Sequence, residues 1–221
     1  NDAVGALEKT SLDWRVYTFK LNYKLNNGFT ISPFYAYSDN DEANAANAKV
    51  HYLGAEGYGK LGMITPRFEL VYANGDTDTY AATGKDYDIS ALAGYASADV
   101  NISSAVIPYF GVTYESGDDD ANDGDIDAFN GITNISRYTP TFGMENAFIY
   151  RFIPVLGSHL YSNNFATLGG GGTPGYGGIS NSSTGNSPGL LSYGIGVKGK
   201  IDNFAYKAQI LFMTFEDAGA L

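Results

Sequence analysis

The sequence contains no cysteine, and this absence excludes a disulfide scaffold and any thiolate chemistry. No apolar run approaches the roughly 18 to 20 residues of a membrane-spanning helix, which excludes helical spans. Histidine is scarce, and the only imidazole bases are His51 and His159. Neither belongs to a serine-centred elbow or a His-Glu-x-x-His arrangement, so we expect that the protein is not an enzyme.

Basic residues are scarce as well, with 13 Lys and Arg against 24 Asp and Glu and a formal net charge of −11. Nucleic-acid binding needs clustered Lys and Arg for phosphate contacts, so this balance argues against a nucleic-acid partner. The first residues, 1–4, have neither a basic nor an apolar leader character. We therefore expect that a signal peptide has been removed or that the chain is a piece of something longer.

What the sequence does have is alternation of apolar and polar residues with a period of two, which is typical of strands with one apolar and one polar face. The clearest case is a hairpin, 13–25 and 29–38, around the Asn- and Gly-rich turn at 26–28. Eight segments of about ten residues show the pattern, and ten is the length that a tilted strand needs to cross a bilayer. The eight predicted strands are 13–25, 29–38, 48–58, 62–74, 87–98, 104–116, 189–199 and 203–215.

The connections alternate between short and long, which is the second signal. Tight turns are expected at 26–28, 59–61, 99–103 and 200–202, and longer connections at 39–47, 75–86 and 117–188. Short turns on one side, long loops on the other and aromatic belts near both are typical of outer-membrane β-barrels. Aromatic residues near the short turns are Tyr23, Phe29, Tyr58, Tyr95, Phe204 and Tyr206, and those near the long loops are Tyr37, Tyr72, Tyr114 and Phe215.

In this pattern the sequence resembles Gram-negative outer-membrane porins over most of its length. A narrower likeness, to the alginate-export type of outer-membrane channel, lies in the order of 114–118, an acidic stretch, 127–129 and 138–140. The resemblance implies an all-β fold, a transmembrane antiparallel up-and-down β-barrel in the bacterial outer membrane. Partners implied by that location are membrane lipid and lipopolysaccharide, with a homotrimer as one arrangement. No substrate is carried over from the alginate-export likeness.

The topology predicts that the barrel is incomplete within residues 1–221, which we treat as one domain. If the turn at 26–28 is periplasmic, eight strands place both ends of the chain outside the cell, whereas complete bacterial barrels have both in the periplasm. We therefore expect flanking strands and a full barrel of ten or more, about 14 to 18 as in porins with an aqueous channel. A closed eight-stranded barrel filled by side chains is the alternative.

The polar side of the predicted strands supplies the candidate functional residues. Charged side chains that line a water-filled pore select ions by sign, because low-dielectric walls focus their field. The alternative is that they form ion pairs that fill and stiffen a narrow barrel. The candidate pore-lining residues are Lys20, Lys24, Arg67, Glu69, Glu115, Lys198 and Lys207.

The longest connection carries an acidic run that would attract cations to the mouth of a pore. Its members are Asp118, Asp119, Asp120, Asp123, Asp125 and Asp127. A solvated loop is the alternative. The run fails the helix-loop-helix calcium motif at Ala121 and Asn130, so we expect no cofactor, although a looser Ca²⁺ site stays open.

The connection 117–188 is too long for a simple loop, and part of it is apolar. One hypothesis folds it inward to narrow the pore, and the other forms an extra hairpin from 146–153 and 158–167. The resulting prediction is a porin, a passive diffusion channel for small hydrophilic solutes and ions. Two alternatives stay open: a barrel that serves adhesion or structure without transport, and a soluble β-sandwich with an aromatic core.

Overall fold

The computed structural model describes residues 14–40, 48–77, 86–120, 123–129 and 189–217. The described residues form strands and connections, and none of them forms a helix long and apolar enough to span a membrane. The predicted extra hairpin, 146–153 and 158–167, and most of the connection 117–188 lie outside the described residues.

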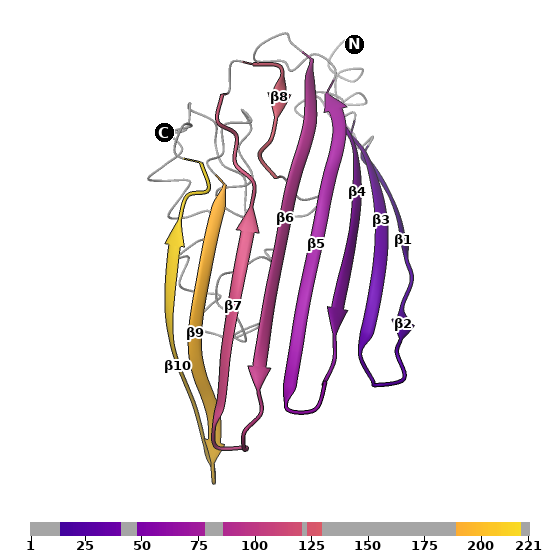
Figure 1. Ribbon diagram of the computed structural model, residues 1–221. Coiled ribbons are helices and arrows are strands. Elements are labelled where there is room, and N and C mark those ends of the chain that lie inside the picture. The colour runs from indigo at the N-terminus through magenta and orange to yellow at the C-terminus, as the bar shows by residue number, and fades with distance from the viewer. Residues whose placement is uncertain (1–13, 41–47, 78–85, 121–122, 130–188, 218–221) are drawn as a thin grey trace, which may run out of the picture.

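One antiparallel up-and-down sheet contains all eight predicted segments (Figure 1). Its long strands are β1 (Trp14–Lys20), β3 (Thr30–Asn40), β4 (Ala48–Tyr58), β5 (Ile64–Thr77), β6 (Tyr87–Val100), β7 (Ile107–Glu115), β9 (Leu190–Ile201) and β10 (Phe204–Thr214). Two short strands, β2 (Tyr23–Lys24) and β8 (Asp125–Ile126), complete the count of ten. Eight predicted strands and their order are therefore confirmed, and β8 is an addition.

The sheet is open in the described part of the chain. The long strands follow the order β1-β3-β4-β5-β6-β7-β9-β10, so that each pairs with its neighbours in sequence and β1 and β10 form the two edges. The alternative of a closed eight-stranded barrel is not what these residues form. Short turns gather at one end of the sheet, and the strand ends that lead into the longer connections lie at the other, as the loop lengths predicted (Figure 1).

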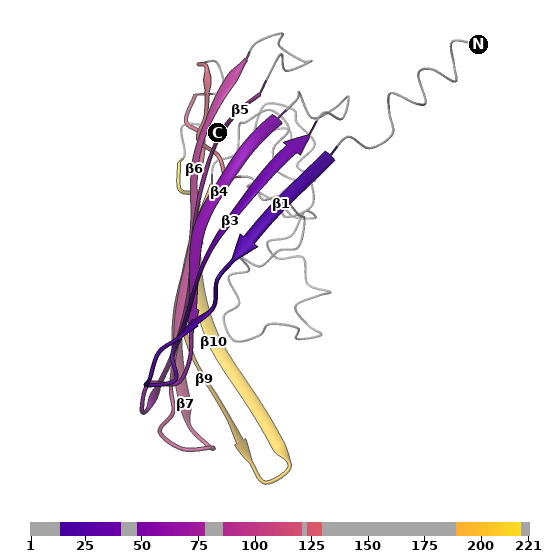
Figure 2. The same ribbon diagram turned by 90° about the vertical axis from the view of Figure 1, so that its right-hand side faces the viewer.

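The first predicted strand, 13–25, is interrupted because a proline lies opposite it. Lys20 pairs with Phe34 in β1, and Tyr23 pairs with Ile31 in β2, so both pieces keep one register against β3. Between them the Leu21 amide donates to the Pro33 carbonyl at 3.0 Å, but Pro33 has no N–H to return a bond. In Figure 2 the β1 arrow ends at this break, and the chain bends in the thin segment that follows.

The two faces of the sheet have inverted exposure compared with a soluble sandwich. The apolar face, defined here by Phe19, Leu53, Leu70, Tyr72, Phe110, Ile195 and Phe212, consists of exposed side chains. The polar face, on the other side, is defined by Lys20, Glu56, Arg67, Glu69, Asp99, Thr113, Ser192, Lys198 and Lys207. Leu53 is 62% exposed, whereas Glu56 is 7% and Ser192 0% exposed. Strand alternation therefore buries polar groups and leaves large apolar ones outside.

Cross-strand rows set the limit of the apolar face on the long-loop side. The outermost row has one charged residue from each of five strands and consists of Arg15, Asp39, Lys49, Asp76 and Asp88. The next row toward the short turns consists of Tyr17, Tyr37, His51, Asn74 and Ser90. Its rings stack, with 6.3 Å between the centroids of Tyr17 and Tyr37 and 4.7 Å between Tyr37 and His51. The row that contains the rings therefore borders the aliphatic band, and the charged row lies beyond it.

The predicted aromatic belt near the short turns is wrong for two of its members. Tyr58 pairs with Arg67 and Tyr95 with Glu69, so both tyrosines belong to the polar face. Proximity to a turn was the basis of the prediction, but the face of a strand residue depends on its parity. Tyr23 and Tyr206 do lie on the apolar face, opposite Ile31 and Gly199.

The turn between β2 and β3 provides a test of the hairpin. Gly28 has a φ of 88°, and no atom lies within 4 Å of the Cβ that alanine would add there. Gly28→Ala is therefore expected to lower the free energy of unfolding by about 1 kcal/mol through backbone strain alone. Urea unfolding would measure it, with Asn26→Ala in the same turn as the control. Equal effects of the two substitutions would contradict the strained conformation.

Candidate functional site: the charged polar face

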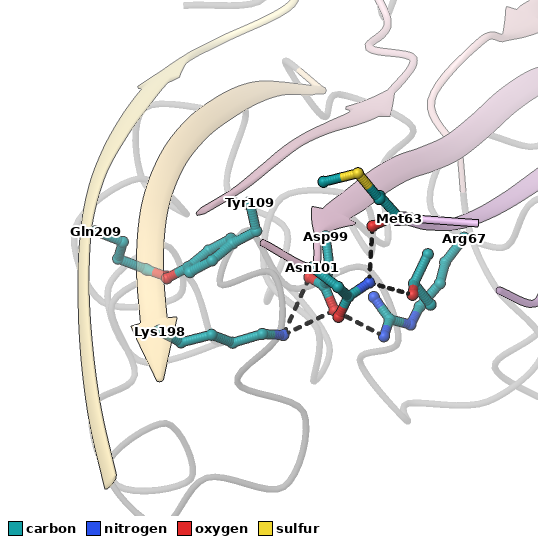
Figure 3. A network of polar contacts seen from close by, with 8 residues as sticks. Met63, Arg67, Asp99, Asn101, Tyr109, Lys198 and Gln209 are labelled. Carbon is teal, nitrogen blue, oxygen red and sulfur yellow. Dashed lines mark hydrogen bonds and ion pairs between the residues drawn. The ribbon is translucent and has the colours of Figure 1, made fainter. Parts of the chain in front are cut away.

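A cluster of charges lies on the polar face near the short turns (Figure 3). Asp99, near the end of β6, accepts hydrogen bonds from Arg67 of β5 at 3.0 Å and from Lys198 of β9 at 2.9 and 3.0 Å. Asp99 is buried, while the side chains of Arg67 and Lys198 keep 32% and 24% of their exposure. One carboxylate thus holds two cations, and the three side chains together retain one positive charge.

An aromatic ring fixes the same region from β7. The Tyr109 hydroxyl donates to Gln209 Oε1 at 2.9 Å, and the ammonium groups of Lys198 and Lys207 lie 5.4 and 5.2 Å from its ring centroid. Lys198 and Lys207 are direct cross-strand partners, and like charges in that position repel. The ring offsets this repulsion because each ammonium group is attracted to its π-electrons.

Gly196 makes room for this ring. A Cβ at Gly196 would lie 2.4 Å from two atoms of Tyr109, so any larger residue would displace it. In Figure 3 the side chains of Tyr109 and Lys198 point to the inner side of the bend that β9 and β10 make. The cations therefore project from the concave side of the sheet.

A second ion pair lies farther toward β1. Lys20 of β1 donates to Glu56 of β4, across β3. Glu56 is the cross-strand partner of Glu69, and both carboxylates are buried, so Lys20 brings a positive charge to an acidic pair. Lys24 lies opposite Thr30 in β2 and is exposed.

At the long-loop end, the side of the sheet that carries the polar face is lined by apolar residues. Small residues there, among them Ala73, Ala91 and Ala93, leave space that the ring of Phe129 fills together with Tyr52. The two rings meet edge to face with centroids 6.4 Å apart. A described part of the long connection therefore packs against the polar face.

Hydrogen bonds hold this part of the connection in place. β8 pairs in parallel with the outer part of β6, beyond the point where β7 has ended (Figure 1). The Phe129 amide donates to the Ser116 carbonyl at 3.1 Å, and the Ser116 hydroxyl donates to the Asp127 carbonyl at 2.6 Å. Together these bonds join residues 123–129 to the end of β7.

The acidic residues of the connection lie around this attachment. Asp118 is only 2% exposed, and its Oδ1 accepts a bond from the Asp120 amide at 3.2 Å. Burial in the first place, and then the neighbouring carboxylates of Asp123 and Asp127, raise the pKa of Asp118 to about 6, although the hydrogen bond from the Asp120 amide lowers it. The pKa of Asp127 is also raised, chiefly by burial and then by nearby carboxylates. The charged form is disfavoured here.

The structure places the predicted residues in two separate groups. All seven candidate pore-lining residues lie on the polar face, with Glu115 buried at the long-loop end of β7 and the other six nearer the short turns. The acidic run lies at the long-loop end, away from the cations. Among the described residues no group of three or more His, Asp or Glu could hold a metal ion, and the calcium hypothesis stays a prediction.

Sequence reasoning missed Asp99, Tyr109 and Phe129 as members of the site. The predicted turn 99–103 includes Asp99, because the fifth predicted strand ends at residue 98, whereas β6 continues to Val100. Extending the alternation by one residue would have put Asp99 on the face of Arg67. No signal in the sequence indicates that Phe129 returns to the sheet, apart from the run of small residues that receives it.

The raised pKa of Asp118 predicts a pH-dependent attachment of this segment. Because the folded pKa of about 6 exceeds the unfolded value of 3.8, stability is highest below pH 3.8 and is lost as the pH rises through 6. Asp118→Asn should therefore stabilise the protein at pH 8 by about 1 to 3 kcal/mol and should have little effect at pH 4. Hydrogen exchange of the amides of Asp120 and Phe129 would measure the change. An effect of equal size at both pH values would contradict the burial of an ionisable carboxyl.

Comparisons with models of known protein families, with curated proteins and with solved structures found no match. The geometry of the two faces and the charges that each carries are the features that bear on function.

Proposed function

We propose that this chain forms part of the wall of an outer-membrane porin, a passive diffusion channel for small hydrophilic solutes and ions. Its strands belong to a transmembrane antiparallel barrel, a larger one than the eight long strands of the open sheet, with the apolar face toward lipid and the polar face toward a water-filled lumen. Transport needs no chemical step, since solutes move down their gradients.

The inverted exposure of the two faces is the observation that carries the proposal. Ile195 and Ile210 are 63% and 60% exposed on one face, while the carboxylates of the other face and hydroxyl side chains such as those of Thr113 and Ser192 are buried. A soluble β-sandwich would pack such an apolar face against a second sheet. In a membrane, lipid tails cover the apolar face, so no second sheet is needed. The polar groups of the other face then line a lumen.

The rows of the apolar face support the same orientation. Tyr and His side chains at the edge of an aliphatic band, followed by charged side chains, match the sequence of environments from bilayer core through interface to water. β9 and β10 extend farther toward the short turns than β1 and β3 (Figure 1). Such a stagger is what tilted strands need if the band is to stay level in a membrane.

A non-transporting barrel that serves adhesion or structure is the second candidate. The packing of Phe129 against Tyr52 favours it, because the ring fills space on the polar face that a wide lumen would leave to water. A filled interior would make the long loops, rather than the lumen, the functional surface.

Single-channel recording in planar bilayers separates the two candidates. A porin with an acidic mouth should give stable conductance steps and a reversal potential that favours cations across a salt gradient. Neutralising Asp118, Asp119 and Asp120 together to Asn should reduce that preference, whereas Asp202→Asn in the β9–β10 turn should leave it unchanged. A folded, inserted protein without steps would overturn the channel and leave the adhesive or structural barrel.

Charge substitution tests the orientation of the sheet independently of transport. Leu70→Arg adds a cation to the apolar face, where a lipid-facing cation near the bilayer centre costs about 2 to 4 kcal/mol. Thr18→Arg adds the same side chain to the polar face of β1 and is the matched control. Folding into lipid vesicles, followed by electrophoretic mobility and protease resistance, should fail only for Leu70→Arg. Failure of Thr18→Arg alone would indicate that the polar face contacts lipid and the apolar face does not.

A further inference from the structure

The charges of the polar face are separated by sign along the strands. In the half of each strand nearest the short turns, cationic side chains outnumber carboxylates. The cations are Lys20, Lys24, Arg67, Lys198, Lys200 and Lys207, and the carboxylates are Glu56, Glu69 and Asp99. In the other half, the described strands contribute Glu115 and no cation to the polar face.

The segment attached at the long-loop end makes this separation stronger. β8 and the bonds of Ser116 hold residues 123–129 beside β6, so that the acidic run stands at the end of the polar face that already carries Glu115. Glu216 is drawn to the same place, where it accepts bonds from the Tyr114 hydroxyl at 2.8 Å and the Gly117 amide at 2.9 Å. These carboxylates are therefore fixed relative to the sheet.

Arg67, Lys198 and Lys207 at the short-turn end are fixed as well. Asp99 holds Arg67 and Lys198 without cancelling both charges, and Tyr109 holds Lys198 and Lys207. Asn101 secures the adjoining turn, because its amide donates to Thr65 Oγ1 at 2.9 Å and to the Met63 carbonyl at 3.0 Å (Figure 3). The positive region is thus a bonded network that spans β5 to β10.

We propose that the polar face is electrically polarised along its strands, anionic at the long loops and cationic at the short turns, so that the channel rectifies ionic current. The inference rests on the proposed channel function. Cations collect at the acidic end and anions at the basic end. A field that drives both toward the middle fills the lumen with carriers, and the opposite field empties it. Current should therefore be larger when the compartment at the long-loop end is positive.

Current–voltage curves of single channels in symmetric KCl test the proposal. At 0.1 M, where the Debye length is about 10 Å, we expect forward current to exceed reverse current about twofold. At 1 M, where that length falls to about 3 Å, the ratio should approach one. Because the chain has no native cysteine, Asn203→Cys carrying a biotin label, with streptavidin added to one compartment, identifies the short-turn side.

Substitutions of Asp99 and Lys198, which contact each other, are expected to change the current ratio in opposite directions. Asp99→Asn makes the short-turn end more positive and should raise the current ratio, whereas Lys198→Gln makes it less positive and should lower it. A structural disturbance of this one network would move both ratios the same way. Lys60→Gln, in the exposed turn before β5, removes a cation outside the strands and is the control.

The outcomes distinguish the inference from the proposed function. Conductance steps with a straight current–voltage curve at 0.1 M, or with ratios that shift in the same direction in both variants, would overturn the polarised wall and leave the porin. Absence of steps from inserted protein would overturn the porin and the inference with it. Opposite shifts at 0.1 M that vanish at 1 M would support both.

Discussion

The backbone ladder is the interaction on which the rest of this structure depends. Each antiparallel strand satisfies its amides and carbonyls through its neighbours, so the side chains have only two directions left, and the fixed period of two assigns each to one face. In β5 this puts Arg67 and Glu69 on one side and Phe68 and Leu70 on the other. A shift of one residue would exchange every member of the two faces. The register therefore positions the charges as well as the strands.

Much of this arrangement could be predicted from the sequence, because alternation and loop length are local signals. The strands 29–38, 48–58 and 62–74 correspond closely to β3, β4 and β5, and the side of Arg67 and Glu69 followed from parity. The prediction of the aromatic belt was wrong where parity was not applied. Tyr58 and Tyr95 were assigned by their distance from a turn, and counting residues along the strand would have placed both on the polar face.

The contacts of the site could not be predicted in the same way, since they join residues on different strands. Arg67, Asp99 and Lys198 come together only after β5, β6, β7 and β9 have been laid side by side, and Lys20 reaches Glu56 across a whole strand. The segment that contains Phe129 pairs with the sheet through only two residues in parallel, and an alternating pattern does not predict so short a pairing. Such partners depend on register and side-chain length summed over several strands, which a linear pattern does not contain.

The aromatic contact between the two lysines has a consequence for how the ends of the sheet respond to their surroundings. The group formed by Lys198, Tyr109 and Lys207 holds its two cations against one ring and contains no carboxyl. At the far end of the strands the buried carboxyl of Asp118 takes up a proton near pH 6. A moderately acidic medium would thus change the charge of the long-loop end of the sheet through Asp118.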